Sequence, residues 1–133
     1  MNLSNTFLRL AVVTAVVGMI WGNVMGATHD HSASSAHAHL NLLGWVSMAV
    51  YGLFYRVAPQ AARGVLPVAH FWLSLLGLVM VIPALAVVLA QYEPLLAVAI
   101  PVAGLSGLVV LLSMVLFAVI VFRNTGREAR VAH

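Results

Sequence analysis

Four segments of the chain are almost wholly apolar, and short polar stretches separate them. Each segment has roughly the 20 residues that an α-helix needs to cross the ~30 Å hydrocarbon core of a bilayer. These segments predict helices over residues 7–26, 37–55, 66–90 and 94–122. Because the links between them are short, successive helices should run antiparallel. The pattern therefore predicts one all-α membrane domain, a polytopic antiparallel bundle of four transmembrane helices.

Polar residues and prolines at the segment boundaries predict where the helices begin. Ser34 or Ser35 is placed to cap the second helix, since a hydroxyl side chain can accept from a first-turn amide. Pro67 and Pro94 suit the first turns of the third and fourth helices, where the missing amide proton costs nothing.

The composition agrees with a membrane setting and removes several functional classes. The chain is 63% hydrophobic and 7% charged, with a mean hydropathy of +1.07, which does not fit a soluble domain. It has no cysteine, so disulfides, thiolate zinc sites and thiol nucleophiles are excluded. The 3 acidic residues form no pair suited to acid–base catalysis, and no phosphate-binding glycine loop is visible. We therefore do not predict an enzyme.

The basic residues predict the orientation in the membrane. All six are arginines that fall on one side of a four-span arrangement: Arg9, Arg56, Arg63, Arg123, Arg127 and Arg130. The links 27–36 and 91–93 carry none. Because basic loops stay in the cytoplasm, both termini and the basic tail 123–133 should be cytoplasmic, in an inner membrane. The histidine-rich link 27–36 should face the periplasm or the outside, and the arginines need no nucleic-acid partner to explain them.

The first segment admits a second interpretation. Residues 1–26 combine a basic residue, an apolar stretch and small residues at the end, as a cleaved signal peptide does. Cleavage after Gly26 would leave a start, Ala-Thr-His, able to chelate Cu(II). The apolar run is long for a signal peptide, and the residues before the cleavage point match a signal-peptidase site poorly. We therefore favour a retained helix.

The second predicted helix begins with two histidines that fall on different faces. Residues three and four apart share a helix face, and the face of His37 collects Asn41, Gly44, Met48, Tyr51 and Tyr55. His39 starts a more apolar face, about 160–200° away. A polar face within a span is costly and marks a functional site by default. His37 is therefore the better candidate for a site inside the bundle, and hydrogen bonding at the membrane interface is its ordinary alternative.

A cluster of possible metal ligands surrounds this helix start. His29, Asp30 and His31 precede His37 and His39 by a few residues, and imidazole with carboxylate can bind copper or zinc. The spacing matches no established metal motif, and a solvated link is the ordinary alternative. His70 should lie about 20–25 Å from His37, since the two enter antiparallel helices from opposite sides. We expect His70 at the interface near Arg63, and no role for His133.

The stretch SAHAHLNLLGWVSMAVYGLFY, residues 35–55, resembles the second transmembrane helix of subunit I in the haem-copper oxidase superfamily. The resemblance implies that His37 corresponds to the axial ligand of a low-spin haem, with His39 as the alternative if the register shifts. Subunit I has many more spans, a second haem ligand and copper-binding histidines, none of which this sequence contains. A complete oxidase is therefore not expected.

Three hypotheses follow. In the first, a b-type haem near the outer leaflet lies between copies of the second helix, with His37 of each of two chains as axial ligands. Gly44 would leave room for the ring and Asn41 would orient an imidazole or a propionate. Such a homo-oligomer would transfer electrons or handle haem beside a respiratory oxidase or another redox partner. In the second, the outer histidines bind copper or zinc. In the third, the chain is an accessory subunit of a respiratory complex without a cofactor.

Overall fold

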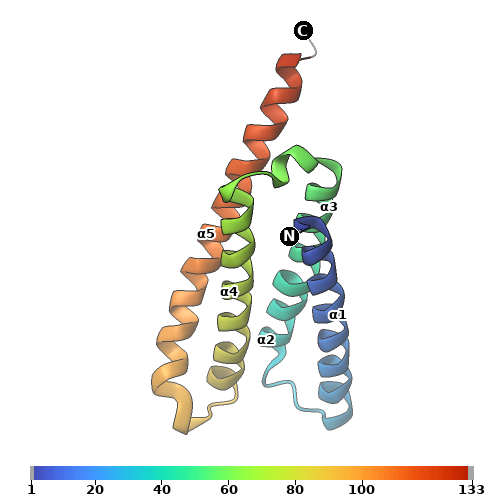
Figure 1. Ribbon diagram of the computed structural model, residues 1–133. Helices are drawn as coiled ribbons and strands as arrows, with labels where there is room; N and C mark the ends of the chain where they lie inside the picture. Colours follow the sequence, from blue (N-terminus) through green and yellow to red (C-terminus); the bar gives the residue numbers. More distant parts are fainter. Residues whose placement is uncertain (1, 132–133) are drawn as a thin grey trace.

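The structure is a computed structural model that describes residues 2–131, with side chains described for residues 2–124, and it is helical along most of its length (Figure 1). In chain order the elements are α1 (Leu3–Thr28), α2 (Ser34–His39), the π-helix η1 (Leu40–Ser47), α3 (Met48–Val57), the 3-10 turn η2 (Pro59–Ala62), α4 (Val65–Leu89) and α5 (Glu93–Val131). No strand occurs among these residues. The all-α prediction is confirmed.

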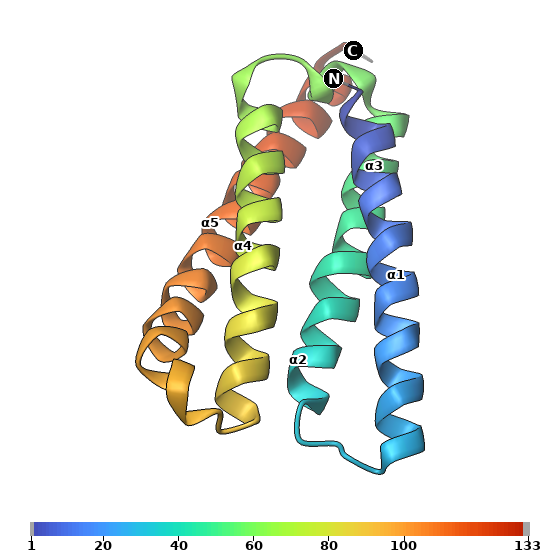
Figure 2. The same cartoon turned by 60° about the horizontal axis from the view of Figure 1, so that its bottom comes forward.

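The helices form two antiparallel hairpins that lie side by side. α1 packs along α2, η1 and α3, and α4 packs along α5, as both views of the ribbon show (Figures 1 and 2). The N-terminus, η2 and the C-terminal part of α5 lie at one end, which we call the arginine end. The links 29–33 and 90–92 lie at the other, which we call the link end.

Three helices are long and apolar enough to cross a membrane: Leu3–Thr28, Val65–Leu89 and Glu93–Asn124. Large apolar side chains along them point outward, including Val12 at 63% exposed and Leu108 at 59%. Exposed apolar surface of this extent is unfavourable in water and expected in lipid. A membrane-embedded protein is therefore the setting that these helices indicate.

The second helical segment is continuous but not a regular α-helix. α2, η1 and α3 contribute 6, 8 and 10 residues without a break. The buried positions Ala36, Leu40, Gly44 and Met48 recur every four residues, which is wider than the α-helical turn of 3.6 residues and suits a locally widened turn. The π-helix thus keeps one face of this segment buried within the bundle, a feature that we did not predict from the sequence.

Two expectations about helix ends have different outcomes. Pro67 and Pro94 lie in the first turns of α4 and α5, as predicted. The predicted cap of the second helix is wrong, because the helix already includes Ser34, and Ala33 at its cap makes no side-chain hydrogen bond.

The last helix is longer than predicted. α5 continues as a helix to Val131, so residues 123–131 of the predicted basic tail extend it. The last residues of the predicted tail, 132–133, lie outside the described residues.

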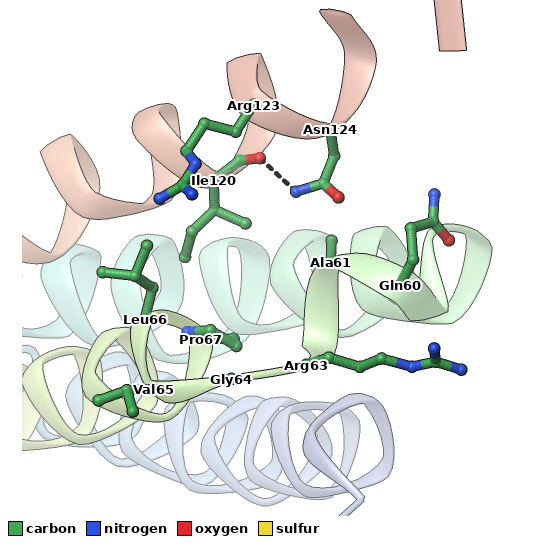
Figure 3. Close-up of a pocket in the computed structure, with 10 residues that line it drawn as sticks. All are labelled: Gln60, Ala61, Arg63, Gly64, Val65, Leu66, Pro67, Ile120, Arg123 and Asn124. Carbon is green, nitrogen blue, oxygen red and sulfur yellow. Dashed lines mark hydrogen bonds between the residues drawn. The ribbon is translucent and has the colours of Figure 1, made fainter. Parts of the chain in front are cut away.

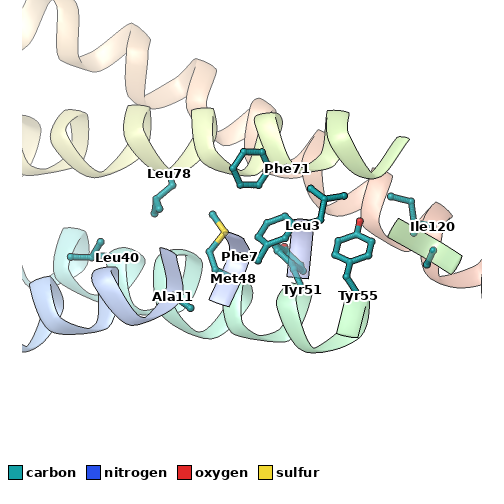
Figure 4. Packing of buried hydrophobic residues seen from close by; sticks show 11 residues of the cluster. Leu3, Phe7, Ala11, Leu40, Met48, Tyr51, Tyr55, Phe71, Leu78 and Ile120 are labelled. Atoms are coloured by element: carbon teal, nitrogen blue, oxygen red, sulfur yellow. The ribbon is translucent and has the colours of Figure 1, made fainter. Parts of the chain in front are cut away.

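An aromatic core lies toward the arginine end, where the two hairpins meet. Phe7 of α1 is 0% exposed and contacts the rings of Tyr51, Tyr55 and Phe71 at centroid distances of 5.2–5.8 Å. Figure 4 shows these rings between the two hairpins, with Met48 and Leu78 further along. Because Phe7 lies in this core, α1 is an integral part of the fold.

Candidate functional site

His37 lies in α2, near the link end, and faces α1. Its side chain is half-buried, and its ring meets Trp21 edge to face, with centroids 6.0 Å apart. Nε2 lies 3.2 Å from Nδ2 of Asn41. Nδ1 is buried and has no hydrogen-bond partner among the described residues, which is unusual, since a buried polar atom without a partner costs free energy. The imidazole therefore has one ring nitrogen whose bonding capacity the fold leaves unused.

Asn41 fixes the position of this imidazole from the next turn. Its Nδ2 donates to the backbone oxygen of His37 at 2.9 Å while lying beside the ring. This amide and the imidazole share one face, as the sequence predicted.

Glycines on α1 allow this close contact. A Cβ on Gly18 would lie 2.6 Å from Oδ1 of Asn41, and one on Gly22 would lie 3.2 Å from Cε1 of His37. The sequence analysis did not identify these glycines, although Gly18, Gly22 and Gly26 recur every four residues, a spacing that favours close helix packing in membranes.

A shallow, open groove of about 670 Å³ runs beside His37. Its α1 side carries Gly18, Gly22 and Gly26, and its other side carries His37 and Asn41. At Gly26 nothing lies within 4 Å of the position that a Cβ would occupy. The groove thus offers open space next to the half-buried imidazole.

Gly44 does not provide the space that the sequence suggested. A Cβ there would come within 2.9 Å of Cβ of Thr14, so the room at Gly44 is already filled by α1. This expectation is corrected: in this chain Gly44 is a packing contact between helices, and the open space lies nearer the link end.

His39 points away from this groove. It is exposed, and its Nδ1 is hydrogen bonded to the backbone oxygen of Ser35 at 2.7 Å. The structure therefore places the two histidines in different surroundings, as their spacing predicted.

The remaining predicted ligands lie in the exposed link. His29 ends α1 in the left-handed conformation, with φ 55°, and His31 is exposed. Oδ1 of Asp30 accepts from the backbone N–H of Ser32 at 2.9 Å, and this hydrogen bond holds the pKa of Asp30 below its usual range. Within the described part of the chain, no three His, Asp or Glu side chains are grouped so as to hold a metal ion. A preformed copper or zinc site is therefore not present at the predicted ligands His29, Asp30, His31, His37 and His39.

His70 departs most from expectation, because it is not at the interface. It is 0% exposed, and its Nδ1 is hydrogen bonded to the hydroxyl of Tyr55 at 2.9 Å. The rings of Phe7, Tyr51 and Phe117 lie 4.5–5.3 Å from it, and its Nε2 has no partner among the described residues. The sequence held a signal that we did not use: His70, Ser74 and Gly77 share one face of α4 and are all buried, and polar residues inside a span usually face the protein interior.

Comparison of the chain with models of known protein families, with curated proteins and with solved structures finds no match.

Proposed function

We propose that this protein binds haem b within the membrane, with His37 as an axial ligand, and that it transfers electrons or handles haem beside a respiratory oxidase. The observation that carries the proposal is that the half-buried His37, together with Asn41 one turn on, lines an open groove beside the glycines of α1. An imidazole inside a membrane span is costly to keep without a function.

The groove suits a flat, mostly apolar cofactor. Its volume of about 670 Å³ lies within the range of about 300–1,000 Å³ of ligand sites in proteins. Gly26 leaves open space along α1, and the Asn41 amide beside the ring restricts its orientation. Bound haem would supply one-electron redox chemistry, while His37 would hold it and Asn41 would position the ligand.

The packing at Gly44 leads us to propose a different position for the haem. Because α1 fills the space at Gly44, we place the ring along the groove between α1 and the second helical segment. The groove is open to its surroundings, so His37 of a second chain could supply the other axial ligand in a homo-oligomer. Ligation by two histidines leaves no free position on the iron, which favours electron transfer or haem handling over substrate oxidation.

The proposal includes a four-span topology with both termini inside. The segment from Ser34 to Val57 is helical throughout and lies alongside α1 over most of its length (Figure 2). The described arginines lie in segments toward the arginine end. The links 29–33 and 90–92, at the link end, carry none. With the arginine end in the cytoplasm of an inner membrane, His37 lies toward the outer leaflet.

The test is an absorption spectrum of the detergent-purified protein, oxidised and reduced. We expect a Soret band and b-type reduced bands in the wild-type protein and their loss in His37→Ala. His39→Ala is the matched control, since this histidine is exposed and makes only a local hydrogen bond; it should keep the spectrum. A protein without a Soret band after supply of haem, or a band that survives His37→Ala, would refute the proposal.

A further inference from the structure

Polar side chains border two cavities that differ in how closely they gather. A cavity of about 520 Å³ lies at the arginine end, between η2, the first turn of α4 and α5 (Figure 3). Its two arginines, Arg63 and Arg123, point to opposite sides, so they do not face a common ligand. A much smaller cavity, of about 20 Å³, lies between the two hairpins. The polar groups around this second cavity all border the same small volume.

Four side chains with hydroxyl groups line the small cavity. Ser47 and Tyr51 come from the second helical segment, Ser74 from α4 and Ser113 from α5. The rest of the wall is apolar and consists of Leu43, Met48, Leu78 and Val110. The cavity is therefore a polar spot in an otherwise apolar contact between the hairpins.

Three of the four hydroxyl-bearing residues are more than nine-tenths buried. Tyr51 is 5% exposed, Ser74 is 7% and Ser113 is 3%. The hydrocarbon core of a bilayer offers no hydrogen-bond partners of its own, and buried polar groups are paired with protein or with ordered water. The hydrogen bonds of these hydroxyl groups can therefore be followed one by one.

The two serines of the second hairpin leave an oxygen with unused capacity. Oγ of Ser74 donates to the backbone oxygen of His70 at 2.7 Å and lies 2.6 Å from Oγ of Ser113. Because a hydroxyl group has a single proton, Ser113 must be the donor in the contact between the serines. Both lone pairs of the Ser113 oxygen then stay available to another donor.

The facing side of the cavity has a matching need for an acceptor. The Tyr51 hydroxyl donates to Sδ of Met114 at 3.9 Å, a long contact to an atom that is a weak acceptor. Ser47 donates to the backbone oxygen of Leu42 at 2.8 Å, which leaves its own oxygen able to accept. One donor without a strong acceptor thus shares the cavity with two oxygens, of Ser47 and Ser113, that lack a donor.

We propose that this cavity binds one water molecule, which accepts from the Tyr51 hydroxyl and donates to Oγ of Ser47 and Oγ of Ser113. Its volume of about 20 Å³ exceeds the roughly 10–15 Å³ that one water needs. Buried waters make about three hydrogen bonds each, the number that this arrangement supplies. The water links the two hairpins inside the membrane, independently of haem binding at His37.

The first test is a high-resolution structure of the full-length protein in a lipid environment. We expect one ordered water at about 2.5–3.0 Å, the usual length of such hydrogen bonds, from Oη of Tyr51, Oγ of Ser47 and Oγ of Ser113. An empty cavity would overturn the proposal. A direct hydrogen bond between Tyr51 and Ser113 that closes the cavity would overturn it as well.

The second test is solid-state NMR of the protein in bilayers, measuring magnetisation transfer from water to the ring of Tyr51. Transfer is expected in the wild-type protein and should be lost in Ser113→Val, because valine removes an acceptor and places methyl groups in the cavity. Ser106→Ala is the matched control and should keep the transfer, since Ser106 is fully buried but donates only to the backbone oxygen of Ala103 within α5.

Two results of the NMR measurement would contradict the proposal. Transfer that survives Ser113→Val would show that the Tyr51 hydroxyl exchanges with water from outside the bundle. Absence of transfer in the wild-type protein would show that the cavity is dry. Circular dichroism checks that the variants retain their helices.

Discussion

At the scale of single residues, the most unusual group is the imidazole of His70 in the aromatic core. Its one hydrogen bond within the described structure is to the hydroxyl of Tyr55, on the neighbouring hairpin. A buried polar group that loses its partner costs about 1–3 kcal/mol, whereas replacing both partners by apolar groups can be nearly neutral. The pair therefore ties the two hairpins together, and its energetic effect depends on both members being present.

This reasoning predicts the outcome of a double-mutant cycle. Tyr55→Phe should lower the free energy of unfolding by about 1–3 kcal/mol, because Nδ1 of His70 then has no partner. His70→Leu in the same chain should recover a large part of that loss. Unfolding is measured by circular dichroism in micelles, with Tyr92→Phe at an exposed link position as the control. Strictly additive effects of the two substitutions would show that the hydrogen bond contributes nothing.

At the scale of elements, the pairing of α1 with the second helical segment depends on glycine contacts. Gly18 faces Asn41, Gly44 faces Thr14, and Cγ of Leu8 lies 2.7 Å from the Cβ position of Gly52. Small residues let helix backbones approach closely, which is the main source of helix association in membranes. The π-helix η1 packs on α1 in the same region, and its wider turn keeps the buried positions of this segment on one face.

Two glycine substitutions on α1 should have opposite effects. Alanine at a glycine in a helix normally stabilises by about 0.5–1 kcal/mol, and Gly26→Ala should do so, since nothing lies within 4 Å of its Cβ position. Gly18→Ala should instead lower the melting temperature, because its Cβ would lie 2.6 Å from Oδ1 of Asn41 and displace that amide. The measurement is thermal unfolding in detergent. Equal melting temperatures for the two variants would show that α1 and the second segment are not packed in this way.

At the scale of the whole molecule, two kinds of surface separate along the bundle. The described arginines lie in parts of α1, α3, α5 and the link after η2 that are toward the arginine end, and the proposed haem groove lies toward the opposite end. If the bundle spans the membrane four times, the groove lies toward the outside and the arginines toward the cytoplasm.

The topology can be tested with introduced cysteines, because the chain has none of its own. Ser32→Cys lies in the link after α1, and Gln60→Cys lies in η2. In intact cells a membrane-impermeant maleimide should label Ser32→Cys alone, and Gln60→Cys should be labelled only after the membrane is opened. Labelling of both positions from the same side would mean that the second segment does not cross, leaving three spans.

The sequence by itself determined the helical class, the approximate extent of the helices and the separation of His37 from His39. These follow from runs of apolar residues and from the period of the α-helix, which are local properties of the chain. The shared face of His37 and Asn41 was visible for the same reason, since the two residues are one turn apart.

The tertiary structure alone decided what each of these faces meets. Three findings depend on contacts between helices. Gly44 packs on Thr14, Gly18 and Gly22 lie against Asn41 and His37, and His70 is buried. In a helix as apolar as α4, only the polar or small residues His70, Ser74 and Gly77 mark the side facing protein, and they do not say which residues of the other helices they meet. The partners of each buried face come from other helices, so only the folded arrangement could reveal these contacts.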